Sequence, residues 1–140
     1  MKIFFDANIL FMASVPGSAN RILLDATQKY AEQCLTNQHI LEEARRNIVN
    51  KKPDQLPEFI KITDKLIISN AFYSSLKIDL LSQNSPVMVG AIGARCTHLL
   101  TANIKYFGKL YRQTIHGVTV VSPAMLADIL VDMGWVTGLL

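Results

Sequence analysis

The residue of this sequence that most needs a chemical explanation is Asp6. It follows an apolar run, residues 3–5, which predicts a strand buried on both faces, as the central strands of parallel sheets are. Open α/β sheets bind their ligands at the carboxyl ends of such strands. A carboxylate buried there costs several kcal/mol unless a cation or hydrogen bonds compensate its charge. Asp6 is therefore either a ligand-binding group or the cap of a loop or helix through an Asx-type hydrogen bond.

Three further polar residues stand where other elements are expected to begin or end. Glu43 lies in a predicted helix, Asn84 precedes a predicted helix start, and Asn103 follows a predicted strand. Each also has an ordinary structural explanation. Glu43 would be a solvated helical glutamate, and the two asparagines would be helix or turn caps. With Asp6, they place four polar side chains at or near the ends of four elements.

Helical and strand patterns alternate along the chain, which predicts a mostly parallel sheet between helices. The predicted strands are residues 3–5, 32–35, 98–101 and 118–121; the predicted helices are one capped by Ser18, one capped by Asn37, then 56–69, 70–81, 87–95 and one starting at Ser122-Pro123; residues 51–54 are predicted as a loop and 82–86 as a turn. We expect a single domain, residues 1–140, with the α/β class of fold: a three-layer α/β/α sandwich around a short central sheet.

Composition places limits on compartment and partners. Half of the residues are hydrophobic and 18% are charged, which is typical of a compact, ordered chain. The formal net charge of +3 permits an anionic partner such as RNA without requiring one. Cys34 and Cys96 form no CxxC motif and no cysteine–histidine cluster, which predicts two buried free thiols in a cytoplasmic protein.

The two ends of the chain give no sign of export or of membrane insertion. No secretory signal is visible at the start, because Asp6 interrupts the first apolar run. The apolar tail, residues 125–140, is too short to cross a bilayer, so no membrane partner is expected. The tail is expected either to pack on the core or to pair with a second subunit, as in a homodimer.

Several other α/β chemistries lack their motifs. No GxGxxG loop, no Walker lysine loop and no GxSxG elbow is present. Phosphatases of the haloacid-dehalogenase type need a second aspartate where this chain has Asn8. His39, His98 and His116 have no spacing typical of metal ligands and are expected to be ordinary surface or packed residues.

Two segments of the chain resemble the PIN-domain family of small metal-dependent nucleases. They are Phe-Asp-Ala-Asn-Ile-Leu (residues 5–10) and Leu-Leu-Thr-Ala-Asn-Ile-Lys-Tyr-Phe (residues 99–107), and the resemblance runs from Asp6 to about Leu130. The family includes the toxin ribonucleases of bacterial and archaeal toxin–antitoxin pairs. The resemblance therefore implies a PIN-like fold and a lineage of ribonucleases.

The resemblance also implies a set of site residues. In the family, acidic residues hold one or two Mg²⁺ or Mn²⁺ ions at four positions, matched here by Asp6, Glu43, Asn84 and Asn103. Hard divalent cations prefer oxygen ligands, and the bound ions orient the scissile phosphate and lower the pKa of the attacking water. Asp6 and Glu43 keep the family's acids and are the expected catalytic residues. Asn8 and Thr101 match the family's flanking polar residues.

Two of the four expected acids are missing. Asn84 and Asn103 keep a carbonyl oxygen but lose the negative charge of the aspartates found in the family. The weaker field should lower the affinity for a metal ion. Asp79 lies five residues before Asn84 and is expected to be a surface charge rather than a substitute ligand.

Basic residues near these positions are candidates for contacts with RNA. Lys105 is close in sequence to Asn103, and Arg45 lies in the same predicted helix as Glu43. Arg45 belongs to a basic cluster that is expected mainly to be a solvated helix face, with contact to phosphate as the lesser alternative; the cluster is formed by Arg45, Arg46, Lys51 and Lys52.

The sequence leaves three functions open. The first is a metal-dependent endoribonuclease that acts on single-stranded RNA and serves as a toxin neutralised by an antitoxin protein. The second is a catalytically inactive PIN-like domain that binds RNA or a protein partner. The third is a structural subunit that dimerises through its apolar C-terminal segment. Metal dependence separates the first from the second, and concentration-dependent association would mark the third.

Overall fold

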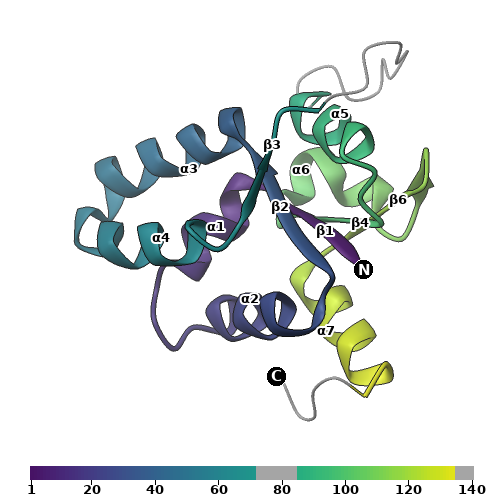
Figure 1. Ribbon diagram of the computed structural model, residues 1–140, viewed down its shortest axis with the longest axis horizontal. Coiled ribbons are helices and arrows are strands. Elements are labelled where there is room, and N and C mark those ends of the chain that lie inside the picture. Colours follow the sequence, from purple (N-terminus) through teal and green to yellow (C-terminus); the bar gives the residue numbers. More distant parts are fainter. Residues whose placement is uncertain (72–84, 135–140) are drawn as a thin grey trace.

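The computed structural model describes residues 1–71 and 85–134, and within them six strands form one sheet with helices on both faces (Figure 1). The strands are β1 (Lys2–Phe5), β2 (Gln33–Asn37), β3 (Ile67–Ser69), β4 (His98–Leu100), β5 (Thr114–Ile115) and β6 (Val118–Val121). The helices are α1 (Ala7–Ala13), α2 (Ala19–Tyr30), α3 (Gln38–Lys51), α4 (Leu56–Thr63), α5 (Ser85–Gly93), α6 (Ile104–Phe107) and α7 (Pro123–Asp132), with 3₁₀ turns η1 (Pro53–Gln55) and η3 (Gly108–Leu110). The α/β class with a mostly parallel central sheet is confirmed.

The strand order of the sheet is β3-β2-β1-β4-β6-β5, and only β5 runs antiparallel to its neighbour. From β1 the chain moves outward to β2 and β3, then returns to the other side of β1 to add β4 and β6. The order therefore reverses between β1 and β4, the place where open α/β sheets bind ligands. The pairing of Phe5 with Leu100 sets the residues that follow these two strands side by side.

The core forms on both sides of the sheet. Helices α1, α3 and α4 lie together on one side, and α5 and α6 lie on the other (Figure 1). Residues 3–5 are fully buried, as the apolar run predicts for a central strand. α3 turns Ile40, Ala44 and Ile48 inward, and these are its buried residues. The sheet and α3 are therefore fixed by apolar packing, and side chains on the flank of α3 are positioned by that packing.

Side-chain oxygens cap the helices where the sequence predicts. The side chains of Ser18, Asn37 and Ser122 each accept a hydrogen bond from the backbone N–H three residues later, at 3.1, 2.9 and 3.2 Å. Such caps satisfy N–H groups that have no partner within the helix. Asn37 is also the last residue of β2, so α3 leaves the sheet without an intervening loop.

The prediction of one helix over residues 56–69 is wrong. α4 ends at Thr63, whose hydroxyl donates to the carbonyl oxygen of Phe59 at 2.8 Å, and residues 67–69 form the edge strand β3. Two consecutive β-branched isoleucines favour a strand, but the apolar spacing of so short a stretch fits either structure. Pairing with β2, which the local sequence does not reveal, decides between them.

Other boundaries differ from the prediction at short elements. Residues 51–54 were expected to be a loop, but Lys51 is the last residue of α3 and η1 follows it closely. Neither α1 nor β5 is predicted by the sequence patterns. β5 joins β6 through His116 and Gly117, whose φ angles of 48° and 86° are both positive, as a two-residue type I′ turn requires.

Some predicted features fall on residues that the structure does not describe. These are the helix predicted over 70–81 beyond residue 71, with Asp79 in it, and residues 82–84 of the predicted turn. In the tail, α7 buries Leu126, Ala127 and Leu130, so the predicted packing on the core is confirmed for this part, while residues 135–140 are not described. No helix among the described residues is long and apolar enough to span a membrane.

Gly90 allows α5 to lie close against the sheet. A Cβ atom added there would lie 2.7 Å from Nδ2 of Asn37 and 2.9 Å from Cζ of Phe4, which is fully buried. We expect Gly90→Ala to lower the free energy of unfolding by about 1–3 kcal/mol, the usual cost of overpacking. In an unobstructed helix the same change would instead raise it by about 1 kcal/mol. Denaturant unfolding measures the sign, and a stabilised variant would contradict the close approach.

Candidate functional site

Asp6 lies at the point where the strand order reverses. Its backbone N–H donates to the carbonyl oxygen of Leu100 at 3.0 Å, which extends the pairing of β1 with β4 by one step. Its side chain accepts a 2.7 Å hydrogen bond from the backbone N–H of Ala7, and Asp6 is the N-cap of α1. The capping explanation of Asp6 is thus confirmed. It does not replace the ligand-binding one, because Asp6 also lines a pocket.

Two side chains from different parts of the sequence hold the Asp6 carboxylate. The hydroxyl of Thr101 donates to Oδ2 at 2.7 Å, and the side-chain amide of Asn8 donates to the same atom at 3.4 Å. Thr101 in turn accepts from the backbone N–H of Asn103 at 3.1 Å, and Asn8 Oδ1 accepts from that of Ala102 at 3.0 Å. The start of α1 and the segment after β4 are therefore joined around one carboxylate.

Asp6 is 4% exposed, and burial is the largest influence on its pKa. Burial raises the pKa, the hydrogen bonds from Thr101, Ala7 and Asn8 lower it, and the charge of Glu43 raises it again. The outcome is a pKa above the usual value for an aspartate. The site therefore disfavours the charged carboxylate unless a positive charge comes near it.

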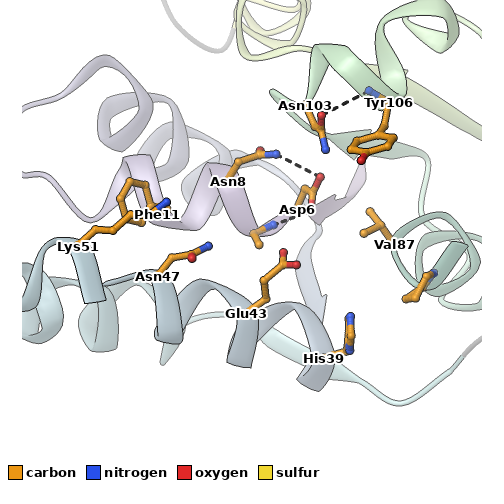
Figure 2. Close-up of a pocket in the computed structure, with 12 residues that line it drawn as sticks. Asp6, Asn8, Phe11, His39, Glu43, Asn47, Lys51, Val87, Asn103 and Tyr106 are labelled. Atoms are coloured by element: carbon orange, nitrogen blue, oxygen red, sulfur yellow. Dashed lines mark hydrogen bonds between the residues drawn. The ribbon is translucent and has the colours of Figure 1, made fainter. Parts of the chain in front are cut away.

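Glu43 faces Asp6 from the other wall of the pocket. It lies on α3 beside the buried Ala44, its carboxylate points toward Asp6 in Figure 2, and it is solvent-exposed. Both residues line one cavity of about 500 Å³, together with Ala7, Asn8, Phe11, His39, Asn47, Lys51, Pro86, Val87, Asn103 and Tyr106. The structure thus brings together the two acids that the sequence singles out.

The donors in this pocket suit a hard cation but form a small set. Among the described residues no three histidine, cysteine, aspartate or glutamate side chains are grouped closely enough to hold a metal ion. Among the described residues that line this pocket, the carboxylates are those of Asp6 and Glu43, and the amide of Asn103 lines it too. Mg²⁺ is typically bound by one or two carboxylates and keeps several of its waters, so this set fits Mg²⁺ or Mn²⁺. With two carboxylates, the set supplies little negative charge to attract the ion.

Of the two asparagines predicted as weak ligands, Asn103 and Asn84, the structure describes only Asn103. Asn103 lines the pocket and is the N-cap of α6, where its Oδ1 accepts from the backbone N–H of Tyr106 at 3.4 Å (Figure 2). The expected cap is confirmed, and it turns the carbonyl oxygen of Asn103 toward Tyr106, so that the amide nitrogen is the end nearer to Asp6 in Figure 2. Asn84 lies outside the described residues.

Four residues along α3 line the pocket as one stripe, and only Glu43 among them was identified from the sequence as a site residue. His39, Glu43, Asn47 and Lys51 recur at intervals of four and all line the cavity. Residues four apart share one face of a helix, so this spacing could have identified the stripe once Glu43 was chosen. Tyr106 and Phe11 complete the walls from other elements, and no local pattern in the sequence marks them.

The two basic residues expected to contact RNA lie outside the lining of the cavity. Lys105 is exposed, and its Nζ lies 5.6 Å from the ring centroid of Tyr106, which does line the cavity. Arg45 is exposed on α3 two residues after Glu43, which places it about 200° around the helix from the stripe. Lys105 is therefore at the rim, and Arg45 faces away.

Comparison with known proteins bears on the fold. No protein-family model matches the sequence, and no curated protein matches it. Among solved structures, the chain is similar to a chain in the crystal structure of VapBC2 from Rickettsia felis bound to a DNA fragment from their promoter. The TM-score is 0.61 at 19% sequence identity, over 87% of this chain and 98% of that one. So low an identity shows the fold alone, and the likeness supports a PIN-like fold.

We expect Asp6→Asn to stabilise the protein in a pH-dependent way. Because the folded-state pKa of Asp6 is raised above the unfolded-state value, the wild-type protein loses stability as pH rises from about 4 through the folded-state pKa. The isosteric amide stays neutral and avoids this loss. Its advantage in unfolding free energy should therefore grow over that range and then remain constant.

Urea unfolding between pH 4 and pH 8 measures this difference. Asp128→Asn, which makes the same change at an exposed position of α7, is the matched control. A stability difference between Asp6→Asn and wild type that is the same at every pH would contradict a raised pKa for Asp6.

Thr101→Val should raise the pKa of Asp6 further, because it removes the 2.7 Å hydrogen bond that stabilises the charged form. It also removes the acceptor for the backbone N–H of Asn103, so the free energy of unfolding should fall by about 1–3 kcal/mol. A carbon-13 NMR titration of the Asp6 carboxyl measures the pKa. Thr101→Ser keeps the hydroxyl and should leave the pKa near its wild-type value; equal pKa values in all three proteins would contradict the role of Thr101.

Proposed function

We propose that the protein is a PIN-like endoribonuclease that uses Mg²⁺ or Mn²⁺ to cleave single-stranded RNA. The observation that carries the proposal is the pairing of Asp6 with Glu43 across an open cavity at the reversal of strand order. A buried carboxylate with a raised pKa is stabilised by a cation, and sites of this kind are enriched at functional centres. The cavity of about 500 Å³ has the size of a site for a nucleotide-sized ligand.

Each site residue has a defined task in this proposal. Asp6 and Glu43 would hold the cation, which would supply a lowered pKa to an attacking water and neutralise charge on the phosphate. Thr101 and Asn8 fix the orientation of the Asp6 carboxylate through the hydrogen bonds that they donate. Asn103 would offer its carbonyl oxygen as a weak neutral ligand, and Asn84 is proposed as a second one from the sequence alone.

A toxin role with an antitoxin partner is part of the proposal. Its support is the fold, which resembles a chain of VapBC2, a toxin–antitoxin complex. RNA as substrate is supported by the positive net charge and by the basic residues at the edge of the pocket, Lys51 and Lys105. A homodimer formed through the C-terminal segment stays a prediction.

A second function is favoured by one observation: the cavity contains Asn103 where the family has an acid. With only two carboxylates among the described lining residues, the field that attracts a divalent cation is weak. The alternative is therefore a PIN-like domain that binds RNA or a protein partner without cleaving it. Such a domain would be indifferent to chelators.

Cleavage of a mixed single-stranded RNA pool in Mn²⁺ tests the proposal. We expect wild-type protein to cleave, EDTA to abolish cleavage, and Asp6→Asn or Glu43→Gln to lower the rate by more than about 100-fold. Removing even the hydrogen-bond partner of a metal ligand typically costs 10- to 100-fold, so loss of a ligand should cost at least as much. Asp128→Asn is again the matched control and should cleave like the wild type.

The missing charges can be restored in the same assay. Asn84→Asp combined with Asn103→Asp should lower the Mn²⁺ concentration needed for half-maximal rate, because each adds a carboxylate to the proposed ligand set. Metal-independent cleavage, or full activity of Asp6→Asn, would contradict the metal-dependent mechanism. If neither wild type nor the double variant cleaves, the binding function is the better account.

A further inference from the structure

The cavity continues past the two carboxylates to a second region with different chemistry. At this end, toward the last turn of α3, it is lined by Phe11 from α1 and by Asn47 and Lys51 from α3 (Figure 2). An amide, an aromatic ring and an ammonium group are not a set of ligands for a hard cation. This end of the cavity therefore needs another explanation than metal binding.

The charge at this end is positive. Lys51 is exposed, and the neighbouring Lys52 holds its Nζ 4.9 Å from the ring centroid of Phe11. Within residues 1–71 and 85–134, no carboxylate lies within ion-pair distance of either lysine. A cation beside an aromatic ring, with a second lysine lining the same end of the cavity, favours a ligand that is both anionic and aromatic, which is the chemistry of a nucleotide.

The spacing along α3 sets the distance between the two regions. Lys51 lies two intervals of four residues beyond Glu43, which corresponds to about 12 Å along the helix axis. The positive charge of Lys51 is therefore attached to α3 about two turns beyond the carboxylate of Glu43. A polymer with regularly spaced phosphates could occupy both regions at once.

We propose that Phe11, Asn47 and Lys51 form a binding subsite for the nucleotide adjacent to the phosphodiester held at Asp6 and Glu43. The base of this nucleotide stacks on Phe11. The amide of Asn47 donates a hydrogen bond to the nucleic acid, and Lys51 contacts the neighbouring phosphate. The choice of single-stranded RNA as the occupant rests on the proposed function. The subsite itself needs neither the metal ion nor cleavage.

Lys51 and Phe11 also have structural roles that the test must separate from binding. Lys51 is in the last turn of α3, where a positive charge stabilises the helix dipole. Phe11 is partly buried and packs against the core. If these roles were the whole explanation, Lys51→Gln and Phe11→Leu would change the melting temperature and leave affinity for RNA unaltered.

Fluorescence anisotropy with a labelled single-stranded oligouridylate in EDTA measures binding without cleavage. We expect Phe11→Leu to weaken binding at least fivefold, as loss of one stacked base does. Lys51→Gln should weaken binding and reduce the slope of log K against log salt by about 0.7, the value for one lost contact with a single-stranded phosphate. Lys65→Gln is the matched control. Lys65 lies beside the first residues of β2 and β3, and so at the amino ends of the strands, whereas the cavity lies at their carboxyl ends.

The outcomes separate this proposal from the proposed nuclease. Binding that depends on Phe11 and Lys51 but without cleavage in Mn²⁺ would support the subsite and remove the enzyme. Cleavage whose KM is the same in Lys51→Gln as in wild type would overturn the subsite and keep the enzyme. Equal losses in Lys51→Gln and Lys65→Gln, or no measurable binding by wild type, would also overturn the subsite.

Discussion

The burial of one carboxylate at the end of the central strand, beside the end of β4, is the constraint on which the rest of the site depends. Asp6 follows the central strand, so its charge is removed from water by the same packing that stabilises the sheet. The cost is partly offset by hydrogen bonds from the start of α1 and from Thr101 after β4. Because these donors come from opposite sides of the strand reversal, the sheet must be assembled before the carboxylate is satisfied.

The same constraint explains why neutral amides around the carboxylate make physical sense. The charge of Glu43 already raises the pKa of Asp6, so each further carboxylate nearby would raise it more. An amide at position 103 keeps a neutral polar group in the cavity and caps α6 without adding repulsion. The consequence is a pocket that is easier to fold without a cation and weaker at attracting one.

Helix α3 relates this carboxylate to the rest of the cavity. Its start is fixed by Asn37, which ends β2, caps the helix and donates to the carbonyl oxygen of Pro86 in α5 at 3.4 Å. Its buried face then leaves one polar flank along the cavity, with Glu43 near Asp6 and Lys51 at the far end. Charge therefore changes sign along one rigid element, which suits a ligand that extends past a single phosphate.

The sequence by itself determined what depends on local patterns. The apolar run of residues 3–5 identified the central strand, and the spacing around Ile40 placed Glu43 on the flank of its helix. Tertiary structure alone decided what depends on pairing between distant segments. It turned residues 67–69 into an edge strand, set Thr101 against Asp6 and brought Phe11 to the cavity, because strand pairing and packing contribute energies that no short window of sequence contains.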